Sequence, residues 1–395
     1  FRRGHSTEMA VTEIVSIITR SLNENSSCLG VNMDLSKAFD SIDHGILCKK
    51  LHKYGIRHKA LEWFQSYLSN RTQQVKYNSA LSTQRTVIRG VPQGSNLGPL
   101  LFLIYVNDMQ YVCTHCEPIM YADDCNIFFK FNRETTNSIS TLVNQQLKDL
   151  SDWFSCNYLS LNVKKTNFMV FSGKRKVSIG AIMINGVLLE QVNSSNFLGI
   201  TIDSMLSWKA HIQKTCGKIS KSIGVLRKIN KNLSKSTMKQ LYNSIILPHL
   251  NYGITIWGSA CPTTINSLYL LQKKSIKIAL RLPWRTSTND LFRDNKILPI
   301  HDLYKLFTGV FVFKHLNSLL PSCFREYFVT NAQHHAHHTR SASLYRLPLF
   351  HTTTAQRSIL YQGPKLWSSI PLTLRQSNSL SSFRYGVKRY LATIQ

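Results

Sequence analysis

Two adjacent carboxylates interrupt an otherwise apolar stretch, IMYADDCNIFF (residues 119–129). Aspartate is depleted in strands and neighbouring like charges repel each other, so a packed core has no obvious use for such a pair. The flanking residues 119–121 and 125–129 have the composition of two short strands, which predicts a hairpin with Asp123 and Asp124 at its tip. A solvated Asp-Asp turn would give the same pattern, so these residues alone leave their role open.

A third carboxylate follows another predicted strand. Residues 29–33 of CLGVNMDLSKAFD form an apolar run that ends on Asp34, and we expect a turn and a helix after it. Carboxylates at strand ends on one sheet edge can hold two hard divalent cations, Mg²⁺ or Mn²⁺, which prefer oxygen ligands. Two such ions clamp the attacking and leaving oxygens of a phosphoryl transfer. Because three close carboxylates without metal would be strongly unfavourable, the pattern predicts a metal cofactor.

A glycine-rich segment, RGVPQGSNLGPLLFLIYVND (residues 89–108), lies between these carboxylates. Its glycines and Pro92 predict a loop, and residues 99–108 predict an apolar helix. Glycine lets the backbone approach a ligand closely, although a glycine-rich turn before a buried helix is a common alternative. The order of the motifs is therefore more informative than any one of them.

With its motifs in this order, the chain resembles the reverse transcriptases of non-LTR (LINE) retrotransposons, most of all the jockey-like elements of animals. Six blocks occur in the family's order: FRRGHSTE (1–8), VNMDLSKAFDSIDH (31–44), RGVPQGSNLGPLLFLIYVND (89–108), YADD (121–124), LSLNVKKTNFMVFS (159–172) and NFLGITID (196–203). The family's looser thumb and tail pattern continues from NYGITIWGS (251–259) to GPKLWSSIP (363–371). The resemblance thus covers nearly all of the chain.

The resemblance implies catalytic roles for four residues. Asp34, Asp123 and Asp124 match the family's three metal-binding catalytic aspartates. Lys165 matches a lysine that protonates the leaving pyrophosphate, which a positioned ammonium can do as a general acid. A solvated pair formed with the adjacent Lys164 is the alternative.

Further positions match contacts to nucleotide and primer. Gln93 and Gly94 match the loop that touches the incoming nucleotide, and Phe39 matches the sugar gate. A bulky ring five residues after Asp34 would collide with a ribose 2′-hydroxyl and so favour dNTPs over rNTPs, whereas a plain core aromatic is the alternative.

The sixth block, NFLGITID, matches the primer grip, a hairpin that positions the primer's 3′ end through Phe197, Leu198 and Gly199. The dipeptide Asn185-Gly186 is a strong type I′ turn signal, and we take it as independent support for this hairpin.

Positive charge is concentrated in the second half of the chain. The 395 residues carry a formal net charge of +28. Residues 1–204 hold 21 lysines and arginines against 16 acids, a net +5, whereas residues 205–395 hold 27 against 4, a net +23. Helices over 208–239 are predicted to expose basic residues that contact a nucleic-acid backbone: Lys214, Lys218, Lys221, Arg227 and Lys228. A solvated basic face is the alternative, although such faces normally intersperse acids.

The remaining motifs exclude several classes of protein. The nine cysteines lack disulfide-like spacing, which indicates an intracellular protein. Cys113 and Cys116 have no second pair at zinc-finger spacing, and HHAHH (334–338) is interpreted as a polar loop. No apolar run approaches the roughly 20 residues of a membrane span, and no signal peptide is visible.

We therefore predict an α+β right-hand polymerase, with a palm of antiparallel sheet and helices, a helical thumb and a C-terminal subdomain. The expected domains are 1–204 (partial fingers and palm), 205–290 (basic thumb) and 291–395 (unknown task). Phe1 falls inside the first block, so we expect an N-terminally truncated chain whose fingers and endonuclease lie upstream.

The predicted function is an RNA-directed DNA polymerase that uses two Mg²⁺ or Mn²⁺ ions, an RNA template, a DNA primer and dNTPs, without a membrane. The family implies a location in nucleus and cytoplasm, and the oligomeric state stays open. One alternative is a catalytically inactive nucleic-acid-binding remnant. Another is a group II intron maturase or an RNA-dependent RNA polymerase, against which Phe39 and the Ala122-Asp123-Asp124 turn both count.

Overall fold

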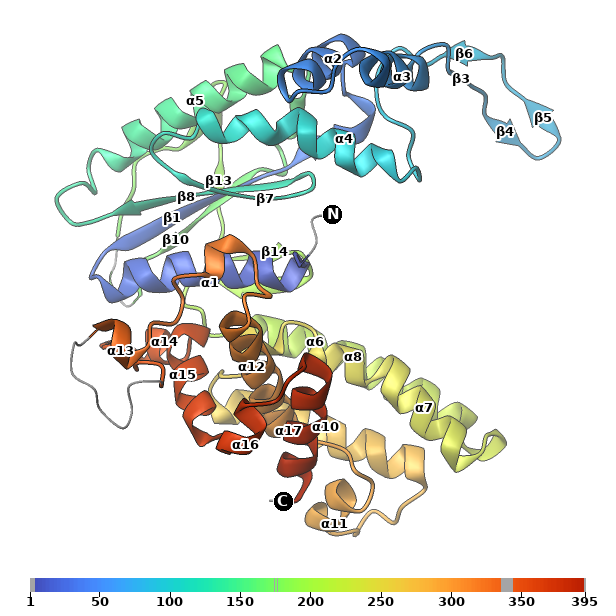
Figure 1. Ribbon diagram of the computed structural model, residues 1–395, viewed down its shortest axis with the longest axis vertical. Coiled ribbons are helices and arrows are strands. Elements are labelled where there is room, and N and C mark those ends of the chain that lie inside the picture. The colour runs from blue at the N-terminus through green and yellow to red at the C-terminus, as the bar shows by residue number, and fades with distance from the viewer. Residues whose placement is uncertain (1–3, 174, 176, 335–343, 394–395) are drawn as a thin grey trace. The chain divides into compact units, whose positions relative to one another are not determined.

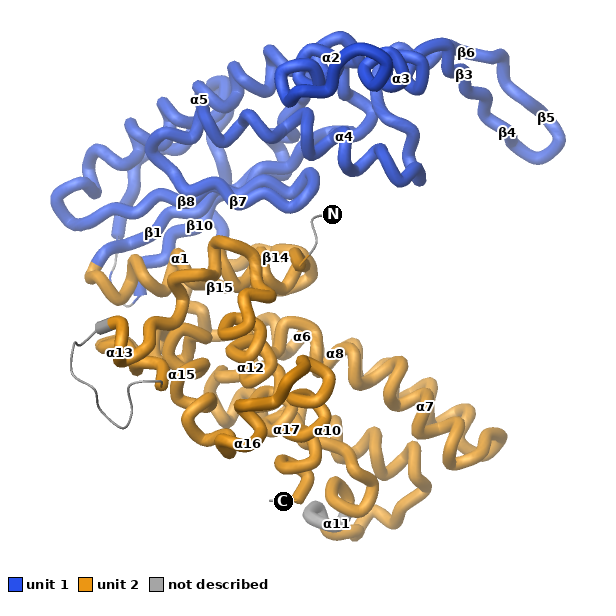
Figure 2. The backbone as a smooth tube through the Cα atoms, in the orientation of Figure 1, with its two compact units in different colours: residues 1, 26–192 blue, residues 2–25, 193–395 orange. Residues whose placement is uncertain are grey.

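The structure, a computed structural model, describes residues 4–173, 175, 177–334 and 344–393, with only the backbone described at 288–290 and 334 (Figure 1). Its contacts divide the chain into unit 1, residues 26–192, and unit 2, residues 2–25 with 193–395 (Figure 2). Both helices and strands are present in each unit. The predicted α+β class is confirmed.

Unit 1 is built on a five-stranded sheet with the order β13-β10-β1-β8-β7. All neighbouring pairs are antiparallel except β10 with β13, which is parallel. The strands are β1 (Ser27–Met33), β7 (Glu117–Tyr121), β8 (Asp124–Phe131), β10 (Asn167–Phe171) and β13 (Glu190–Gln191). The strands predicted at 29–33, 119–121 and 125–129 are thus confirmed, each slightly longer than expected.

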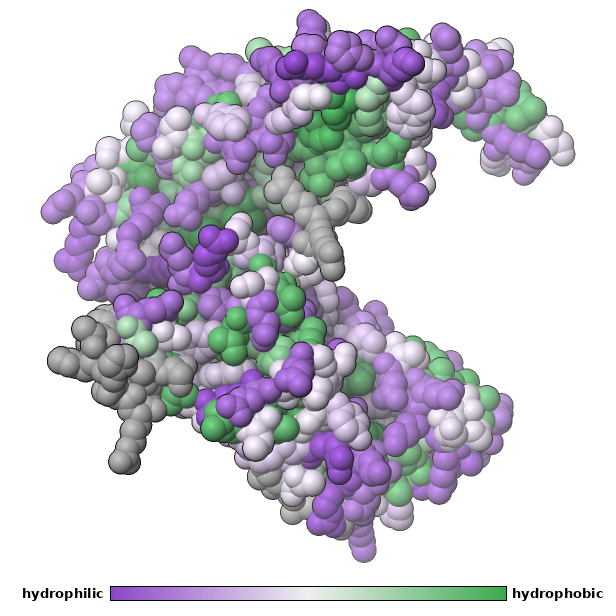
Figure 3. Space-filling view, in the orientation of Figure 1, coloured by the Kyte–Doolittle hydropathy of each residue, from purple (hydrophilic) through white to green (hydrophobic). Residues whose placement is uncertain are grey.

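Four helices cover one face of this sheet (Figure 1). They are α2 (His44–Lys53), α3 (Lys59–Leu68), α4 (Leu97–Val106) and α5 (Ile139–Cys156). Because side chains alternate along a strand, Leu29, Val31 and Met33 of β1 all enter the core beneath the helices. The helix α4 is apolar on every side, yet Leu100 stays 46 % exposed. Figure 3 shows hydrophobic atoms gathered over α4 on the face in view.

Shorter elements of unit 1 lie around this core. The 3₁₀ helices are η1 (Ala38–Asp40) and η2 (Asn107–Tyr111), and β2 (Leu35–Ser36) pairs with β9 (Ser160–Leu161). An exposed ribbon pairs β3 (Thr72–Gln73) with β6 (Arg85–Thr86) and β4 (Lys76–Tyr77) with β5 (Ala80–Leu81). The ribbon projects beyond α3 in Figure 1.

The Asn185-Gly186 turn belongs to a hairpin of its own, β11 (Met183–Ile184) with β12 (Val187–Leu188). Both turn residues have positive φ, 51° and 77°, as a type I′ turn requires. The predicted turn type is confirmed, but its use as support for the NFLGITID hairpin was wrong. That block forms a separate hairpin in unit 2, β14 (Ser194–Phe197) with β15 (Ile200–Asp203).

Unit 2 is otherwise helical. Its longer helices are α1 (Thr7–Asn23), α6 (Lys209–Ile229), α7 (Lys235–Ile245), α10 (Pro262–Leu280), α12 (Ile300–Leu316), α15 (Ile359–Ser369) and α17 (Leu380–Thr393). Its shorter ones are η3 (Asn230–Asn232), α8 (Leu247–Asn251), α9 (Ile254–Trp257), α11 (Thr288–Arg293), η4 (Ser322–Phe324), α13 (Asn331–His334), α14 (Thr353–Gln356) and α16 (Leu372–Arg375). α10 packs on α6 and α7, while α12 packs on α15 and α17.

The compact units do not follow the three predicted domains. Helix α1 and the β14–β15 hairpin are grouped with the C-terminal helices, and no break falls near residue 290. The predicted partition into palm, thumb and C-terminal region therefore stays a prediction about functional parts. None of the described helices is long and apolar enough to cross a membrane.

Candidate active site and nucleic-acid contacts

The three predicted carboxylates emerge at one end of the sheet of unit 1. β1 and β8 run antiparallel with Met33 opposite Cys125, so the next pair beyond the ladder is Asp34 and Asp124. The charge of Asp34 acts on the pKa of Asp124, so the two carboxylates lie near each other. Asp124 also pairs with Tyr121 across the β7–β8 hairpin, which leaves Ala122 and Asp123 as its two-residue turn. Strand register alone therefore brings together residues that are 90 positions apart.

The turn is held in an unfavourable conformation. Ala122 has φ +55°, a left-handed value that costs an L-residue with a Cβ about 1–2 kcal/mol. The surrounding strands maintain this conformation, and it keeps the turn to two residues. Asp123 and Asp124 are consequently both exposed at the strand end.

The carboxylates affect one another electrostatically. The pKa of Asp124 is raised above its ordinary value, first by burial and then by the negative charges of Asp123 and Asp34. The Nζ of Lys165 lies 3.5 Å from Oδ2 of Asp34, and the two side chains are 71 % and 39 % exposed. Solvent screens an ion pair with that exposure, so it offsets only part of the repulsion.

This set of oxygen donors fits a divalent cation that arrives with its substrate. Among the described residues, no three His, Cys, Asp or Glu side chains form a group that could hold a metal. Mg²⁺ commonly binds one or two carboxylates and completes its shell with water and substrate phosphates, without an all-protein cage. An open cluster of mutually repelling carboxylates has the chemistry that such an ion requires.

The segment that carries Lys165 is folded onto the end of β1. Residues 160–161 pair with residues 35–36, and the amide of Asn162 donates to the carbonyl of Asp34 at 2.8 Å. The amides of Lys165 and Thr166 then donate to the carbonyl of Asn162, each at 3.0 Å. This compact turn explains why Lys165, which was predicted from the LNVKKT motif, stands beside Asp34.

A row of asparagines lies on the same face of the sheet as Asp34 and Asp124. Asn32 is opposite Asn126 on one side and Asn167 on the other. The Nδ2 of Asn32 donates to Oδ1 of Asn167 at 2.9 Å. Sequence reasoning missed this polar row, although a spacing of two residues from each aspartate was the available signal.

The glycine-rich loop is fastened to the helix that follows Asp34. The amide of Gly90 donates to the carbonyl of Ile42 at 2.8 Å, and that of Val91 donates to the carbonyl of Phe39 at 3.0 Å. Gly90 has φ +89°, and a Cβ there would lie 2.9 Å from the Cα of Asp40. The close approach therefore requires glycine.

The nucleotide-loop residues take up different positions. The Nε2 of Gln93 donates to Oδ1 of Asp40 at 2.8 Å, so Asp40, which sequence reasoning did not single out, orients the predicted nucleotide contact. Gly94 has φ +83° with open space around it. Phe39 is partly buried, and its ring centroid lies 4.6 Å from that of Phe102.

An open groove of about 1030 Å³ lies beside this loop. It is bounded by η1, the base of the β3–β6 ribbon and residues 86–93, and Lys37, Arg71 and Arg89 supply its basic side chains. Gln93 and Asp40 line it as well, whereas Phe39 and Gly94 are not among its lining residues.

In unit 2, three sequence blocks meet at the tip of the predicted primer-grip hairpin. Leu198 and Gly199 form its turn with φ of 45° and 84°, while Phe197 is buried. The hydroxyl of Tyr252 contacts the carbonyl of Leu198 and lies 3.0 Å from Oγ1 of Thr7. The next amide, Gly253, donates to Oε1 of Glu8 at 2.8 Å.

These contacts join blocks 1–8, 196–203 and 251–259. Sequence reasoning assigned no role to Tyr252, Thr7 or Glu8, because nothing in the sequence shows that such distant blocks meet.

The corner between β15 and α6 is tightly hydrogen-bonded. Asp203 accepts bonds from the amides of Met205 (3.2 Å), Ser207 (2.9 Å) and Trp208 (2.9 Å). The amide of Thr201 donates to Nδ1 of His211 at 3.3 Å. Burial, followed by the charges of nearby lysines, lowers the pKa of His211 to about 4. This corner fixes the hairpin on the first turn of α6.

All five predicted basic contacts are exposed on α6. At about 100° per residue, Lys214, Lys218, Lys221 and Lys228 fall within a stripe about 80° wide. Arg227 lies about 140° from the middle of that stripe. The helix therefore presents four of the five residues together and separates Arg227 from them. The Nζ of Lys214 also donates to Oγ1 of Thr201 at 3.1 Å.

The minor cysteine and histidine motifs give no further site. The pKa of Cys113 is lowered by a hydrogen bond with Cys116. In the stretch HHAHH, residue 334 ends α13 and residues 335–338 lie outside the described residues.

Residues 1–202 match the family model described as "Reverse transcriptase (RNA-dependent DNA polymerase)". Over 310 residues the chain is 28% identical to "Probable RNA-directed DNA polymerase from transposon X-element" of Drosophila melanogaster, covering 76% of this chain and 34% of that protein. It is 26% identical over 324 residues to "RNA-directed DNA polymerase from mobile element jockey" of the same fly, covering 76% and 34%. The chain thus spans about a third of the length of these relatives.

Among solved structures, a telomerase from Candida albicans in complex with a fragment of telomeric RNA is similar at 14% identity and a TM-score of 0.39. The match covers 70% of this chain and 51% of that chain.

Proposed function

The chain belongs to the reverse transcriptase (RNA-dependent DNA polymerase) family, and on this premise we propose that it extends a DNA primer with dNTPs on an RNA template. The observation that carries the proposal is the convergence of Asp34, Asp123 and Asp124 at one end of the sheet. Like the jockey and X-element polymerases that it resembles, it would serve the copying of a retrotransposon.

The three aspartates would hold two Mg²⁺ or Mn²⁺ ions. When bound, such a pair lowers the barrier of an in-line displacement by stabilising the charge on the attacking and leaving oxygens. In that displacement the primer 3′-hydroxyl gives its proton to solvent, its oxygen attacks the α-phosphorus of the dNTP, and the bond from this phosphorus to the pyrophosphate oxygen breaks. Lys165, whose Nζ lies 3.5 Å from Oδ2 of Asp34, would give a proton to the departing pyrophosphate.

Nucleotide selection would rest on the segment from Lys37 to Gly94. Gln93, held by Asp40, offers its amide to the incoming nucleotide, and Gly94 lets the backbone approach it. The basic side chains of the adjacent groove, Arg71 and Arg89, suit phosphate groups of the template or nucleotide. Phe39 is braced by Phe102, which would give a sugar gate the rigidity to exclude a 2′-hydroxyl.

Unit 2 would hold the nucleic acid itself. The hairpin tip at Phe197, Leu198 and Gly199 would position the primer, and Tyr252 keeps that tip in place. The lysine stripe of α6 would contact backbone phosphates without reading sequence. Arg227 would contribute less, because it lies on another side of the helix.

The test is primer extension on poly(rA) primed with oligo(dT), with Asp123→Asn as the variant. We expect the Mg²⁺-dependent rate to fall at least about 100-fold, because metal-bound charge stabilisation supplies several kcal/mol of the barrier. Binding of the primed template should be nearly unchanged. The matched control is Asp152→Asn, an exposed aspartate on α5, which should keep the wild-type rate.

A variant that retained a large fraction of the wild-type rate would remove Asp123 from the site. If neither variant nor wild type incorporated dTTP while both bound the primed template, the chain would be a catalytically inactive nucleic-acid-binding protein.

A second experiment tests sugar selection by Phe39. Phe39→Val should raise kcat/KM for rNTPs relative to dNTPs, because a smaller side chain leaves room for the 2′-hydroxyl. Comparing the two substrates on one variant cancels any loss of folded protein caused by weaker packing against Phe102. Phe39→Tyr, which keeps the ring, should retain the wild-type ratio. An unchanged ratio in Phe39→Val would leave Phe39 as a core aromatic.

A further inference from the structure

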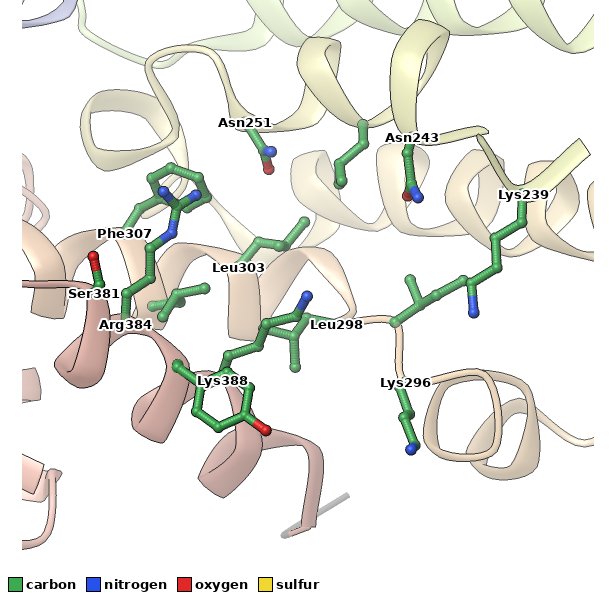
Figure 4. Close-up of a pocket in the computed structure, with 14 residues that line it drawn as sticks. Lys239, Asn243, Asn251, Lys296, Leu298, Leu303, Phe307, Ser381, Arg384 and Lys388 are labelled. Atoms are coloured by element: carbon green, nitrogen blue, oxygen red, sulfur yellow. The ribbon is translucent and has the colours of Figure 1, made fainter. Parts of the chain in front are cut away.

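A second concave site lies in unit 2, lined both by residues of the predicted thumb and by residues of the region 291–395, for which the sequence predicts no task. It is a cavity of about 580 Å³ between α7, α8, the segment 296–298, the first half of α12 and α17 (Figure 4). Its lining divides into a basic rim, an apolar floor and two asparagines, and each part points to a property of the ligand.

The rim carries four cationic side chains, Lys239, Lys296, Arg384 and Lys388, and among the side chains that the structure describes no acid lines the cavity. Arg384 and Lys388 rise from α17, and Lys239 comes from the facing helix α7 (Figure 4). Lys296, Arg384 and Lys388 are exposed, so a ligand can reach them. The charge is therefore complementary to a polyanion whose charged groups are spread along the cavity.

The floor is apolar, which an inorganic anion would not require. Leu298 and Leu303 are buried there, and Phe307 lies under the guanidinium of Arg384 at 5.5 Å from ring centroid to Cζ. A flat aromatic group could stack against this pair, since arginine and phenylalanine both present planar faces.

One residue that lines the cavity carries a hydrogen-bond acceptor that has no donor among the described residues. The Oδ1 of Asn251, on α8, is buried and makes no hydrogen bond. A buried acceptor without a donor costs about 1–3 kcal/mol, and a ligand N–H group would recover this once the side chain turns Oδ1 toward the cavity. Figure 4 shows the amide of Asn251 directed into the cavity.

We propose that this cavity binds a single-stranded polynucleotide, with phosphates on the four cations and one unstacked base on the floor beside Phe307. After a rotation of the Asn251 side chain, an N–H group of that base would donate to its Oδ1. The inference rests on the proposed function for the class of ligand, because the family acts on polynucleotides. A duplex offers phosphates but keeps its bases paired, so it would leave the floor and Asn251 unused.

The site would give α17 and the segment around Lys296 a function apart from catalysis. It would anchor a single strand on unit 2 through cations that belong neither to the α6 stripe nor to the carboxylate site. Such an anchor tolerates any sequence, since stacking and phosphate contacts are available to every nucleotide.

The test compares two triple variants of the full chain with the same change in charge. The first, K296E/R384E/K388E, alters the cavity rim. The matched control, K235E/R285E/K365E, alters two lysines and one arginine that are exposed elsewhere on unit 2 and do not line the cavity. Fluorescence anisotropy would measure the binding of labelled rC8, dC8 and an eight-base-pair duplex, and thermal unfolding would confirm that both variants fold.

The rim variant should bind rC8 at least about 10-fold more weakly than the control variant does. Each lost phosphate contact should flatten the slope of log K against log[salt] by about 0.7, or about 2 for three contacts. An equal loss of affinity for rC8 and dC8 in the rim variant would show that the site binds both RNA and DNA. A loss for only one of them would show which of the two the site binds. Duplex binding should differ little between the two variants.

Asn251→Leu supplies the second arm, because it removes the acceptor but no charge. It should weaken the binding of rC8 about threefold or more and leave the binding of an abasic octamer unaffected. An equal loss of affinity for rC8 in both triple variants would overturn the proposal. The proposal would also be overturned if poly-Glu, but not poly(rC), competed with labelled rC8 for binding. No polymerisation is measured here, so a failure of Asp123→Asn to reduce primer extension would leave this outcome unchanged.

Discussion

Aspartates play opposite energetic roles at two places in this molecule. At the sheet end of unit 1, the charges of Asp34 and Asp123 add to burial in raising the pKa of Asp124, and one exposed lysine stands nearby. At the corner of unit 2, Asp203 accepts from three backbone amides within 3.2 Å. The repulsion at the sheet end destabilises the folded chain, whereas the hydrogen bonds to Asp203 stabilise it.

The difference distinguishes the proposed metal-binding carboxylates from a structural carboxylate by their partners. A carboxylate saturated with donors within its own fold has little capacity left for a ligand. Carboxylates that repel each other are stabilised by a cation, which is the situation expected of a catalytic metal site. Three predictions test this contrast, in order of decreasing effect.

The largest effect is the loss of stability that we expect when the pH is lowered, through His211 at the corner between β15 and α6. The pKa of His211 is lowered from 6.5 to about 4, so as pH falls below 6.5 the unfolded chain binds a proton that the folded chain does not. The stability contributed by neutral His211 is present above pH 6.5 and is lost progressively toward pH 4. Over 2.5 pH units the loss approaches about 3 kcal/mol.

Urea unfolding at pH 7 and pH 4.5 would measure this change. His211→Gln should show a smaller loss between the two pH values, since the other histidines titrate in both proteins. An identical loss in wild type and variant would mean that the buried ring is not the group responsible.

The next effect concerns Asp203 itself. Asp203→Ala removes the acceptor for three amides at the start of α6 and should lower the free energy of unfolding by about 2 kcal/mol. Asp203→Asn keeps one carbonyl oxygen and should lose less. Chemical denaturation of both variants provides the measurement. An unchanged free energy of unfolding in Asp203→Ala would show that water replaces these hydrogen bonds without cost.

The smallest effect, with the opposite sign, is expected at the sheet end. Asp124→Asn removes one of the mutually repelling charges, so without metal it should stabilise the chain by a few tenths to about 1 kcal/mol. Added Mg²⁺ should raise the Tm of the wild type more than that of the variant, because an ion that binds only the folded state stabilises it. A destabilised Asp124→Asn would place Asp124 with Asp203 among the structural carboxylates.

Local structure was largely predictable from residue types and spacing. The strands around Asp34 and around the Asp123-Asp124 pair, the apolar helix after the glycine-rich loop and the basic helix α6 all follow from local patterns. The turn type of Asn185-Gly186 was also predictable, since both residues tolerate positive φ. The assignment of that turn to the NFLGITID hairpin was wrong. Turn chemistry specifies a local bend but does not determine which other strands lie nearby.

The sequence by itself determined the chemistry that the chain can offer: three carboxylates at strand ends, glycines that permit close backbone approach, and a strong positive charge after residue 204. Only the tertiary structure decided which of these groups meet. The register of β1 against β8 brings Asp34 near Asp124, Asp40 orients Gln93, and Tyr252 joins blocks about 50 and 245 residues away. Periodicity is a property of neighbouring residues, whereas pairing across a sheet and packing between helices depend on the whole fold. The cavity around Asn251 has the same origin, since its lining comes from helices α7, α8, α12 and α17, none of which carries a recognisable motif for it.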